Sequence, residues 1–183
     1  LLRVATYWIE NFDIDAWRLD VANEIDHQFW RDFRKAVLAK KSDLYILGEI
    51  WHTSQPWLQG DEFHAVMNYP LSESIKDYFL RQRKKTEQFI SEINNQSMYY
   101  KQQISEVMFN LLDSHDTERI LTTAKGNVQH VKAALTFLYL QKGTPCIYYG
   151  TELALIGGPD PDCRRVMPWD RVSEDNDMLN FMK

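Results

Sequence analysis

The stretch DAWRLD at residues 15–20 has the pattern of a short strand that ends in polar residues. Residues 23 to about 40 then follow the pattern of a helix, whose apolar side chains share one face through a four-residue spacing: Ile25, Phe29, Phe33 and Val37. Asn23 is the expected N-cap of this helix, because its side-chain oxygen can accept hydrogen bonds from free backbone N–H groups. The apolar run LYIL at residues 44–47 predicts the next strand.

The same alternation continues to the end of the chain. Further strands are expected at residues 63–68, 107–112 and 145–149, and helices from 71 to about 79, from 86 to about 94 and along Val128, Val131, Leu135 and Leu138. Alternating strands and helices are typical of parallel βα units, and about five strands are fewer than the eight of a closed (β/α)8 barrel. The sequence therefore predicts the α/β class, with residues 1–183 as a single segment of a partial (β/α)8 TIM barrel. A doubly wound parallel sheet is the alternative, although no glycine-rich phosphate loop follows any strand.

The composition excludes several classes of protein. With 44% hydrophobic residues among 183, the chain has enough apolar surface for a sizeable core. A net charge of -5 argues against nucleic acid or an anionic membrane as partner, and no stretch approaches the roughly twenty apolar residues that span a bilayer. The two cysteines, Cys146 and Cys163, are too few for a disulfide scaffold, so a reduced, cytoplasmic setting is expected. Because the chain starts in mid-pattern without an initiator Met, we expect a piece of a longer protein.

Three acids follow predicted strands, namely Asp20, Glu49 and Asp116. Active sites of parallel α/β folds lie at this end of the strands, and two carboxylates facing one site are what glycosidic-bond cleavage requires, one ionised and one holding a proton. Arg18 leaves the strand on the same face as Asp20, which favours a charged aspartate. The apolar neighbours of Glu49, Ile50 among them, favour its protonated form. Roles as helix caps, as surface acids or as a structural Arg18–Asp20 pair are the alternatives.

Other side chains near the strand ends fit a sugar site. His115 adds a hydrogen-bond donor beside Asp116, with loop capping as the alternative. Aromatic rings could stack on sugar faces or belong to the core: Trp51, Trp57, Tyr69 and Tyr149. A metal site built from Asp20, Glu49, His115 and Asp116 is a further alternative, which the charge of Arg18 disfavours.

Three motifs resemble, in order and separation, signature regions of the α-amylase family of glycoside hydrolases. They are WRLDVANE at residues 17–24, LGEIWH at 47–52 and NLLDSHD at 110–116. Further stretches are similar to the neopullulanase, cyclomaltodextrinase and maltogenic amylase branch: VANE at 21–24, MNYP at 67–70, YYGTE at 148–152 and CRR at 163–165. The resemblance covers nearly the whole chain. It implies roughly strands 4 to 8 of the catalytic barrel with their helices, its second half.

The resemblance also implies roles for individual residues. Asp20 would be the nucleophile and Glu49 the general acid/base of a retaining double displacement, with Asp116 stabilising the transition state. Six further positions would bind substrate: Arg18, His115, Glu24, Trp51, Asp162 and Arg164.

The implied reaction is hydrolysis of α-1,4-glucosidic bonds in cyclodextrin, pullulan or starch-type α-glucans, with transglycosylation as a second outcome. An α-glucan is therefore the expected partner, a homo-oligomer is a further expectation, and no cofactor is expected beyond a calcium ion in the complete protein. We expect the segment by itself to be inactive. A non-catalytic, amylase-like binding or accessory subunit is the alternative function.

Overall fold

The structure is a computed structural model that describes all residues, Leu1–Lys183. It divides into two compact units. Unit 1 contains residues 1–68, 97–109 and 142–144, and unit 2 contains residues 69–96, 110–141 and 145–183.

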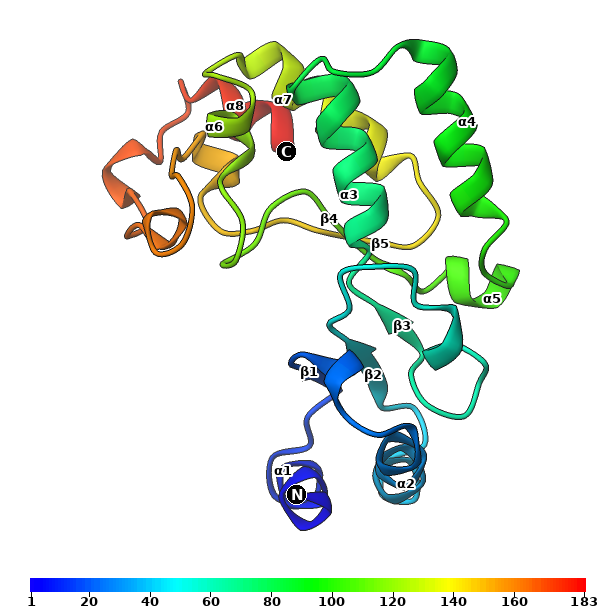
Figure 1. The fold of residues 1–183 in the computed structure, drawn as a ribbon. Helices are drawn as coiled ribbons and strands as arrows, with labels where there is room; N and C mark the ends of the chain where they lie inside the picture. The colour runs from blue at the N-terminus through cyan, green and yellow to red at the C-terminus, as the bar shows by residue number, and fades with distance from the viewer. The chain divides into compact units, whose positions relative to one another are not determined.

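Unit 1 is built on a three-stranded parallel sheet in the order β1-β2-β3. Its elements in chain order are α1 (Leu2–Phe12), β1 (Ala16–Leu19), α2 (His27–Leu38), β2 (Tyr45–Gly48), β3 (Ala65–Val66) and α5 (Gln102–Ser105). The register places Leu19 opposite Gly48, and Gly48 opposite Val66. Helices α1 and α2 lie next to one another (Figure 1). A parallel bridge from Met67 to Phe109 continues the pairing beyond β3.

Close packing on Gly48 holds the sheet of unit 1 against its flanking loop. A Cβ atom at Gly48 would lie 2.7 Å from the ring of Phe63, so only glycine fits there. The Phe63 ring meets Trp30 of α2 edge to face, with centroids 5.2 Å apart. Both aromatic side chains are buried, as is Ile46 of β2, so this contact is part of the core of unit 1.

The start of α2 differs from the prediction. Asp26, not Asn23, caps the helix, because its side chain accepts from the backbone N–H of Gln28 at 2.9 Å. Asn23 lies instead in a 3-10 turn, Ala22–Glu24, which follows Val21 in the left-handed region at φ 45°. The chain turns here because the Ala22 N–H donates to the Glu49 carbonyl at 3.1 Å. The predicted helix residues before Asp26 therefore lie outside α2, in the 3-10 turn and at Ile25.

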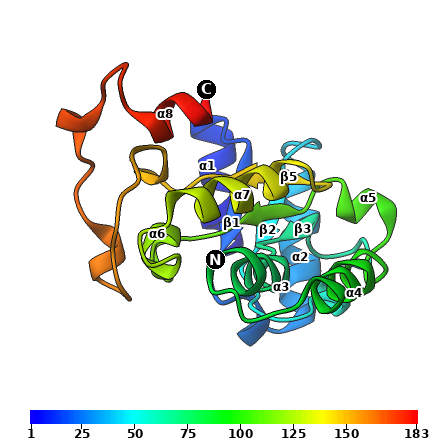
Figure 2. The same ribbon diagram turned by 90° about the horizontal axis from the view of Figure 1, so that it is seen from above.

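Unit 2 is mainly helical. Its helices are α3 (Tyr69–Ile75), α4 (Thr86–Ser97), α6 (Ile120–Thr123), α7 (Val128–Tyr139) and α8 (Asp177–Met182). Helices α3 and α4 lie side by side in both views (Figures 1 and 2), and Gln96 donates to the Ser74 hydroxyl at 2.9 Å. The predicted apolar stripe of α7 is confirmed in the core, where Leu135 and Leu138 are buried with Ile75.

The two remaining strands are β4 (Phe109–Leu111) and β5 (Thr144–Cys146), which pair in a separate sheet. All five expected strands are thus present; β2 is shifted by one residue from its apolar run, and the other four are shorter than the predicted strands. Several helices differ from the predictions: α5, α6 and α8 were not expected, and α3 passes into a π-helix at Lys76–Leu80. Short helices of four to six residues carry too few apolar positions to show a period. None of the helices is long and apolar enough to cross a bilayer.

Candidate active site

The carboxyl ends of β1 and β2 bring Asp20 and Glu49 to one edge of the sheet in unit 1. Each acid follows the last residue of its strand, and those last residues, Leu19 and Gly48, are paired in the register. The Glu49 N–H donates to the Leu19 carbonyl at 2.9 Å, so the backbone ladder reaches the acid itself. The two strand ends therefore hold the acids on neighbouring strands.

Arg18 contacts both carboxylates. Its Nη1 atom pairs with Asp20 Oδ1, and its Nη2 atom lies 2.8 Å from Glu49 Oε1. The second Glu49 oxygen, Oε2, accepts from the backbone N–H of Val21 at 3.0 Å. The cross-strand contact between Arg18 and Glu49 was not predicted, because the alternation of side chains within one strand says nothing about its neighbour.

The two acids differ in exposure to solvent. The Glu49 side chain is 5% exposed, whereas the Asp20 side chain is 73% exposed. A buried carboxylate is held in a fixed direction by its two polar partners, and an exposed one is open to a ligand. The cluster of one arginine and two carboxylates carries a formal charge of +1 - 2 = -1 when both acids are ionised.

Glu24 and Trp51 lie in the loops that follow β1 and β2. Glu24 ends the 3-10 turn Ala22–Glu24, and its N–H donates to the Val21 carbonyl at 3.1 Å. Trp51 comes two residues after Glu49 and is 48% exposed. Of the three predicted substrate-binding residues of unit 1, these two therefore follow the strands and are open to solvent, and the third, Arg18, lies within β1.

In unit 2, His115 and Asp116 follow β4 and meet Arg164. His115 Nε2 lies 3.0 Å from Asp116 Oδ2. The Arg164 Nε atom donates to the His115 carbonyl at 3.0 Å, and Arg164 Nη2 donates to Asp116 Oδ1 at 3.4 Å. The structure thus joins three of the predicted residues, two of them 48 or more positions from the third.

The carboxylate of Asp162 pairs with Arg165, whereas Arg164 contacts Asp116. The two Asp162 oxygens accept from Arg165 at 2.9 Å each, and Oδ2 also accepts from the Gly158 N–H at 2.7 Å. The hydrogen bond from Arg165 holds the pKa of Asp162 below its ordinary value. These bonds fix the loop in which Asp162 and Arg164 lie.

Two buried charged residues near this loop were missed by the sequence prediction. Arg119 is fully buried, donates to the carbonyls of Cys163 (2.7 Å) and Tyr149, and lies 3.9 Å from the ring centroid of Tyr148. No local pattern marks this arginine, because all these partners lie at least 29 residues away along the chain.

Asp113 is the second missed residue, although it belongs to the NLLDSHD motif. Burial raises the pKa of its carboxyl to about 6, and Oδ2 accepts from the Ile120 N–H at 3.1 Å and from the Thr151 hydroxyl at 3.4 Å. Its side chain therefore supports the loop from inside, whereas His115 and Asp116 are partly exposed.

A metal site is not found among these residues. No group of three or more His, Cys, Asp or Glu side chains has an arrangement that could hold a metal ion. Arg18 also occupies the position between two of the four side chains that the metal alternative would use.

A sequence model described as the alpha-amylase catalytic domain matches residues 1–183, which is the whole chain. The chain belongs to the α-amylase catalytic domain family. Three curated relatives match all 183 residues of the chain. The intracellular maltogenic amylase of Bacillus subtilis (strain 168) is 54% identical to it, and the cyclomaltodextrinase of Geobacillus thermopakistaniensis is 51% identical. The neopullulanase 2 of Thermoactinomyces vulgaris is 45% identical. The matched region is 31% of each relative, so this α-amylase family chain spans about a third of their length.

A solved structure supports the same assignment. The cyclic α-maltosyl-(1→6)-maltose hydrolase of Arthrobacter globiformis superposes with a TM-score of 0.95 and 39% identity, over 99% of this chain and 41% of that one. The family has the TIM-barrel fold, so the α/β segment described here is part of a barrel. The predicted resemblance to the α-amylase family, and to its maltogenic amylase and cyclomaltodextrinase branch, is confirmed.

Proposed function

We propose that the protein carrying these residues is a glycoside hydrolase that cleaves α-1,4-glucosidic bonds of cyclodextrin, pullulan or starch-type α-glucans. The observation that carries the proposal is the contact of Arg18 with Asp20 and Glu49 at the ends of two neighbouring strands. The names of the relatives, cyclomaltodextrinase and maltogenic amylase among them, support the substrate class. We propose further that residues 1–183 supply the second half of the barrel, roughly strands 4 to 8, and that the protein is intracellular like the relative so named.

In the proposed reaction, Glu49 protonates the glycosidic oxygen while Asp20 attacks the anomeric carbon. The covalent glycosyl intermediate is then released by water, or by an acceptor sugar in transglycosylation, from which Glu49 takes a proton. The side chain of Asp20 is exposed where a sugar could approach it, whereas the buried Glu49 is aimed by Arg18 and the Val21 N–H.

The other predicted residues are proposed to bind and distort the sugar. Asp116 would stabilise the transition state, with His115 and Arg164 holding its carboxylate through the contacts at 3.0 and 3.4 Å. Glu24 and Trp51 would contact the acceptor side of the substrate. Asp162 would contact the donor side.

Asp20→Asn and Glu49→Gln test the assignment in the complete protein. Asp20→Asn should abolish cyclodextrin hydrolysis, and Glu49→Gln should lower kcat by about 1000-fold or more, because the nucleophile and the proton donor are removed without a change in size. The measurement is the release of reducing sugar, with the anomer of the first product followed by NMR. Retention predicts the α-anomer.

The matched control is Asp32→Asn, which removes an exposed carboxylate of α2 outside the site. Its activity should remain within about twofold of the unmodified protein, because surface acids rarely affect a distant site. Near-normal turnover by either active-site variant would contradict the assignment. A complete protein that binds cyclodextrin and never cleaves it would favour the non-catalytic alternative.

A further inference from the structure

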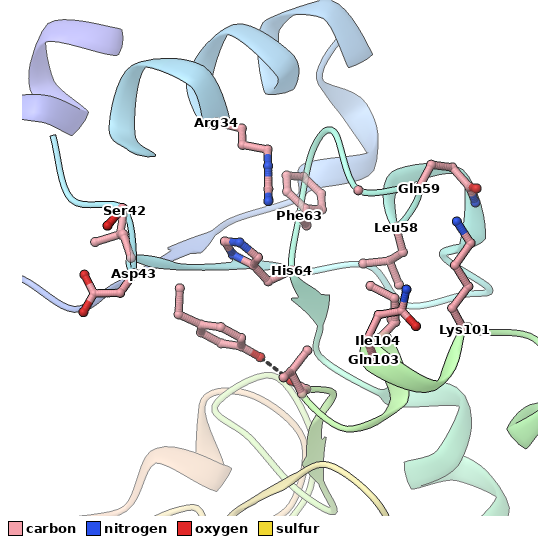
Figure 3. Close-up of a pocket in the computed structure, with 14 residues that line it drawn as sticks. Arg34, Ser42, Asp43, Leu58, Gln59, Phe63, His64, Lys101, Gln103 and Ile104 are labelled. Atoms are coloured by element: carbon pink, nitrogen blue, oxygen red, sulfur yellow. Dashed lines mark hydrogen bonds between the residues drawn. The ribbon is translucent and has the colours of Figure 1, made fainter. Parts of the chain in front are cut away.

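A cavity of about 400 Å³ lies at the amino ends of β2 and β3, the opposite end of β2 from Glu49. Its walls come only from unit 1, namely from α2, α5 and the residues that precede the two strands (Figure 3). Leu58, Phe63 and Ile104 give it an apolar lining. Cavities of this volume with a few convergent polar groups are typical of small-molecule sites.

Arg34 projects from α2 toward Phe63 and His64 at this cavity (Figure 3). Its guanidinium forms no ion pair, and its single hydrogen bond to the protein is the one from Nη1 to the Glu62 carbonyl at 3.2 Å. Burial lowers the pKa of Arg34, with the charge of Asp61 acting in the opposite direction. A partly buried guanidinium whose remaining N–H groups have no protein acceptor can pair favourably with an anion.

His64 adds a second hydrogen-bond donor, and the ring nitrogen that carries its proton can be assigned. The backbone N–H of Ile46 donates to His64 Nδ1 at 3.0 Å, so Nδ1 must be the unprotonated nitrogen. Burial, and then the charge of Arg34, lower the pKa of His64 to about 4, so the ring is neutral at pH 7. Its proton therefore lies on Nε2, which can donate to a ligand. The ring of Tyr45 stacks beside it at 6.2 Å, with its hydroxyl bound to the Val107 carbonyl at 2.6 Å.

The remaining charged groups of the lining leave an excess of positive charge. Lys101 lines the cavity on the side of Gln59, and Asp43 lies on the other side beside Ser42 (Figure 3). Two cations, Arg34 and Lys101, and one carboxylate with a neutral His64 give +2 - 1 = +1. The cavity thus offers cationic donors at an apolar wall.

We propose that this cavity binds a small organic anion, whose carboxylate pairs with Arg34 and accepts from His64 Nε2 while its apolar body packs on Leu58, Phe63 and Ile104. The site lies at the end of the strands away from the proposed catalytic acids of unit 1, and it does not depend on the proposed function.

The test is a calorimetric titration of the complete protein with benzoate, and with benzyl alcohol as its neutral analogue. Benzoate should bind one-to-one, and benzyl alcohol at least about tenfold more weakly, because a charge-assisted hydrogen bond contributes roughly 10- to 100-fold in affinity. Inorganic phosphate, which has the charge without the apolar body, should also bind more weakly than benzoate. The Nε2–H proton of His64 gives an NMR signal that can be assigned by its loss in His64→Gln. Its chemical shift should change when benzoate is added.

Arg34→Gln and Lys35→Gln form the matched pair of variants. Glutamine at position 34 retains a donor for the Glu62 carbonyl and removes the charge, so the fold is kept and benzoate affinity should fall at least about tenfold. Lys35 is the next residue of α2, does not line the cavity, and its substitution should leave affinity unchanged. The proposal is overturned if benzoate does not bind, if benzyl alcohol binds equally well, or if Arg34→Gln binds benzoate like the unmodified protein. Hydrolysis is not a readout, so failure here is distinct from failure of the proposed catalytic residues.

Discussion

Arg18 is the residue on which the geometry of the strand ends in unit 1 depends. Its planar guanidinium presents separate nitrogen atoms to Asp20 and Glu49, which orients two carboxylates with one side chain. A lysine carries the same charge on one compact ammonium group, so it cannot hold both acids in the same directions.

Arg18→Lys is therefore expected to lower kcat for cyclodextrin hydrolysis by about 100-fold with a much smaller change in KM, because misdirected catalytic groups affect the transition state most. Steady-state kinetics on the complete protein measure both constants. Arg31→Lys is the control, since Arg31 is an exposed residue of α2 that pairs with Asp61. Equal kinetics of Arg18→Lys and the unmodified protein would refute the role of Arg18.

The raised pKa of Asp113 predicts that the free energy of unfolding depends on pH. Its folded-state pKa of about 6 is above the ordinary value of about 3.9, so the folded protein holds the proton more tightly than the unfolded chain. The contribution of Asp113 to the free energy of unfolding is therefore greatest below pH 4 and falls as the pH rises to about 6.

Asp113→Asn removes this titration. At each pH, the free energy of unfolding of the variant is compared with that of the unmodified protein. This difference should shift in favour of the variant by about 1 to 3 kcal/mol from pH 4.5 to pH 7, because each unit of pKa shift corresponds to about 1.4 kcal/mol. Urea unfolding at the two pH values measures the difference. A difference that is the same at both pH values would show that Asp113 does not titrate in this range.

At the scale of the element, α2 shows how a loop contact sets the start of a helix. The chain leaves β1 through Val21 and Ala22, which are tied to Glu49 by two backbone N–H groups. Only after this turn is the backbone free to enter the helix, and Asp26 is the residue placed to cap it.

Asp26→Ala should lower the free energy of unfolding by about 1 kcal/mol, because the first turn of α2 loses its side-chain acceptor. Asn23→Ala, at the position that the sequence favoured, should change it by less than about 0.5 kcal/mol, since Asn23 caps nothing. Chemical denaturation of both variants compares the two positions. A larger loss for Asn23→Ala than for Asp26→Ala would contradict the observed cap.

The loop of unit 2 between residues 149 and 164 is held by a similar long-range contact. Arg119 binds the carbonyls of Tyr149 and Cys163, and its own N–H donates to the Gly157 carbonyl at 3.0 Å. One buried arginine thus fixes both ends and the middle of the segment that carries Asp162 and Arg164.

At the scale of the whole molecule, unit 1 exposes a strand edge and an apolar helix face to solvent. β1 is at one edge of its three-stranded sheet. Helix α1 and its N-cap, Leu1, expose a run of apolar side chains: Leu1, Val4, Tyr7, Trp8 and Phe12. Unpaired strand edges and exposed apolar faces both favour association between copies.

Residues 1–183 produced alone are therefore expected to self-associate and to lack hydrolytic activity. Size-exclusion chromatography with light scattering gives the mass, and the cyclodextrin assay gives the activity. Val4→Lys with Phe12→Lys should reduce association, because both side chains lie on the exposed face of α1. A stable monomer with full activity would contradict this expectation.

The sequence predicted the positions of the strands and of the acids better than the helix ends. Asp20 and Glu49 could be placed because each follows an apolar strand, and polarity after a strand is a local signal. The starts of α2 and α6 could not be placed, because the residues just before these helices are held by distant partners: Val21 and Ala22 donate to Glu49, and the Arg119 N–H donates to the Gly157 carbonyl.

By itself, the sequence determined the α/β class, the five strands and the membership of the α-amylase family, all of which rest on periodicity and ordered motifs within single segments. Only the tertiary structure decided which side chains meet: Arg18 with Glu49, Arg164 with Asp116, Asp113 with Thr151, and Arg34 with the cavity. The physical reason is that these contacts join segments far apart along the chain, whose pairing is set by the packing of strands and helices and not by the residues next to them.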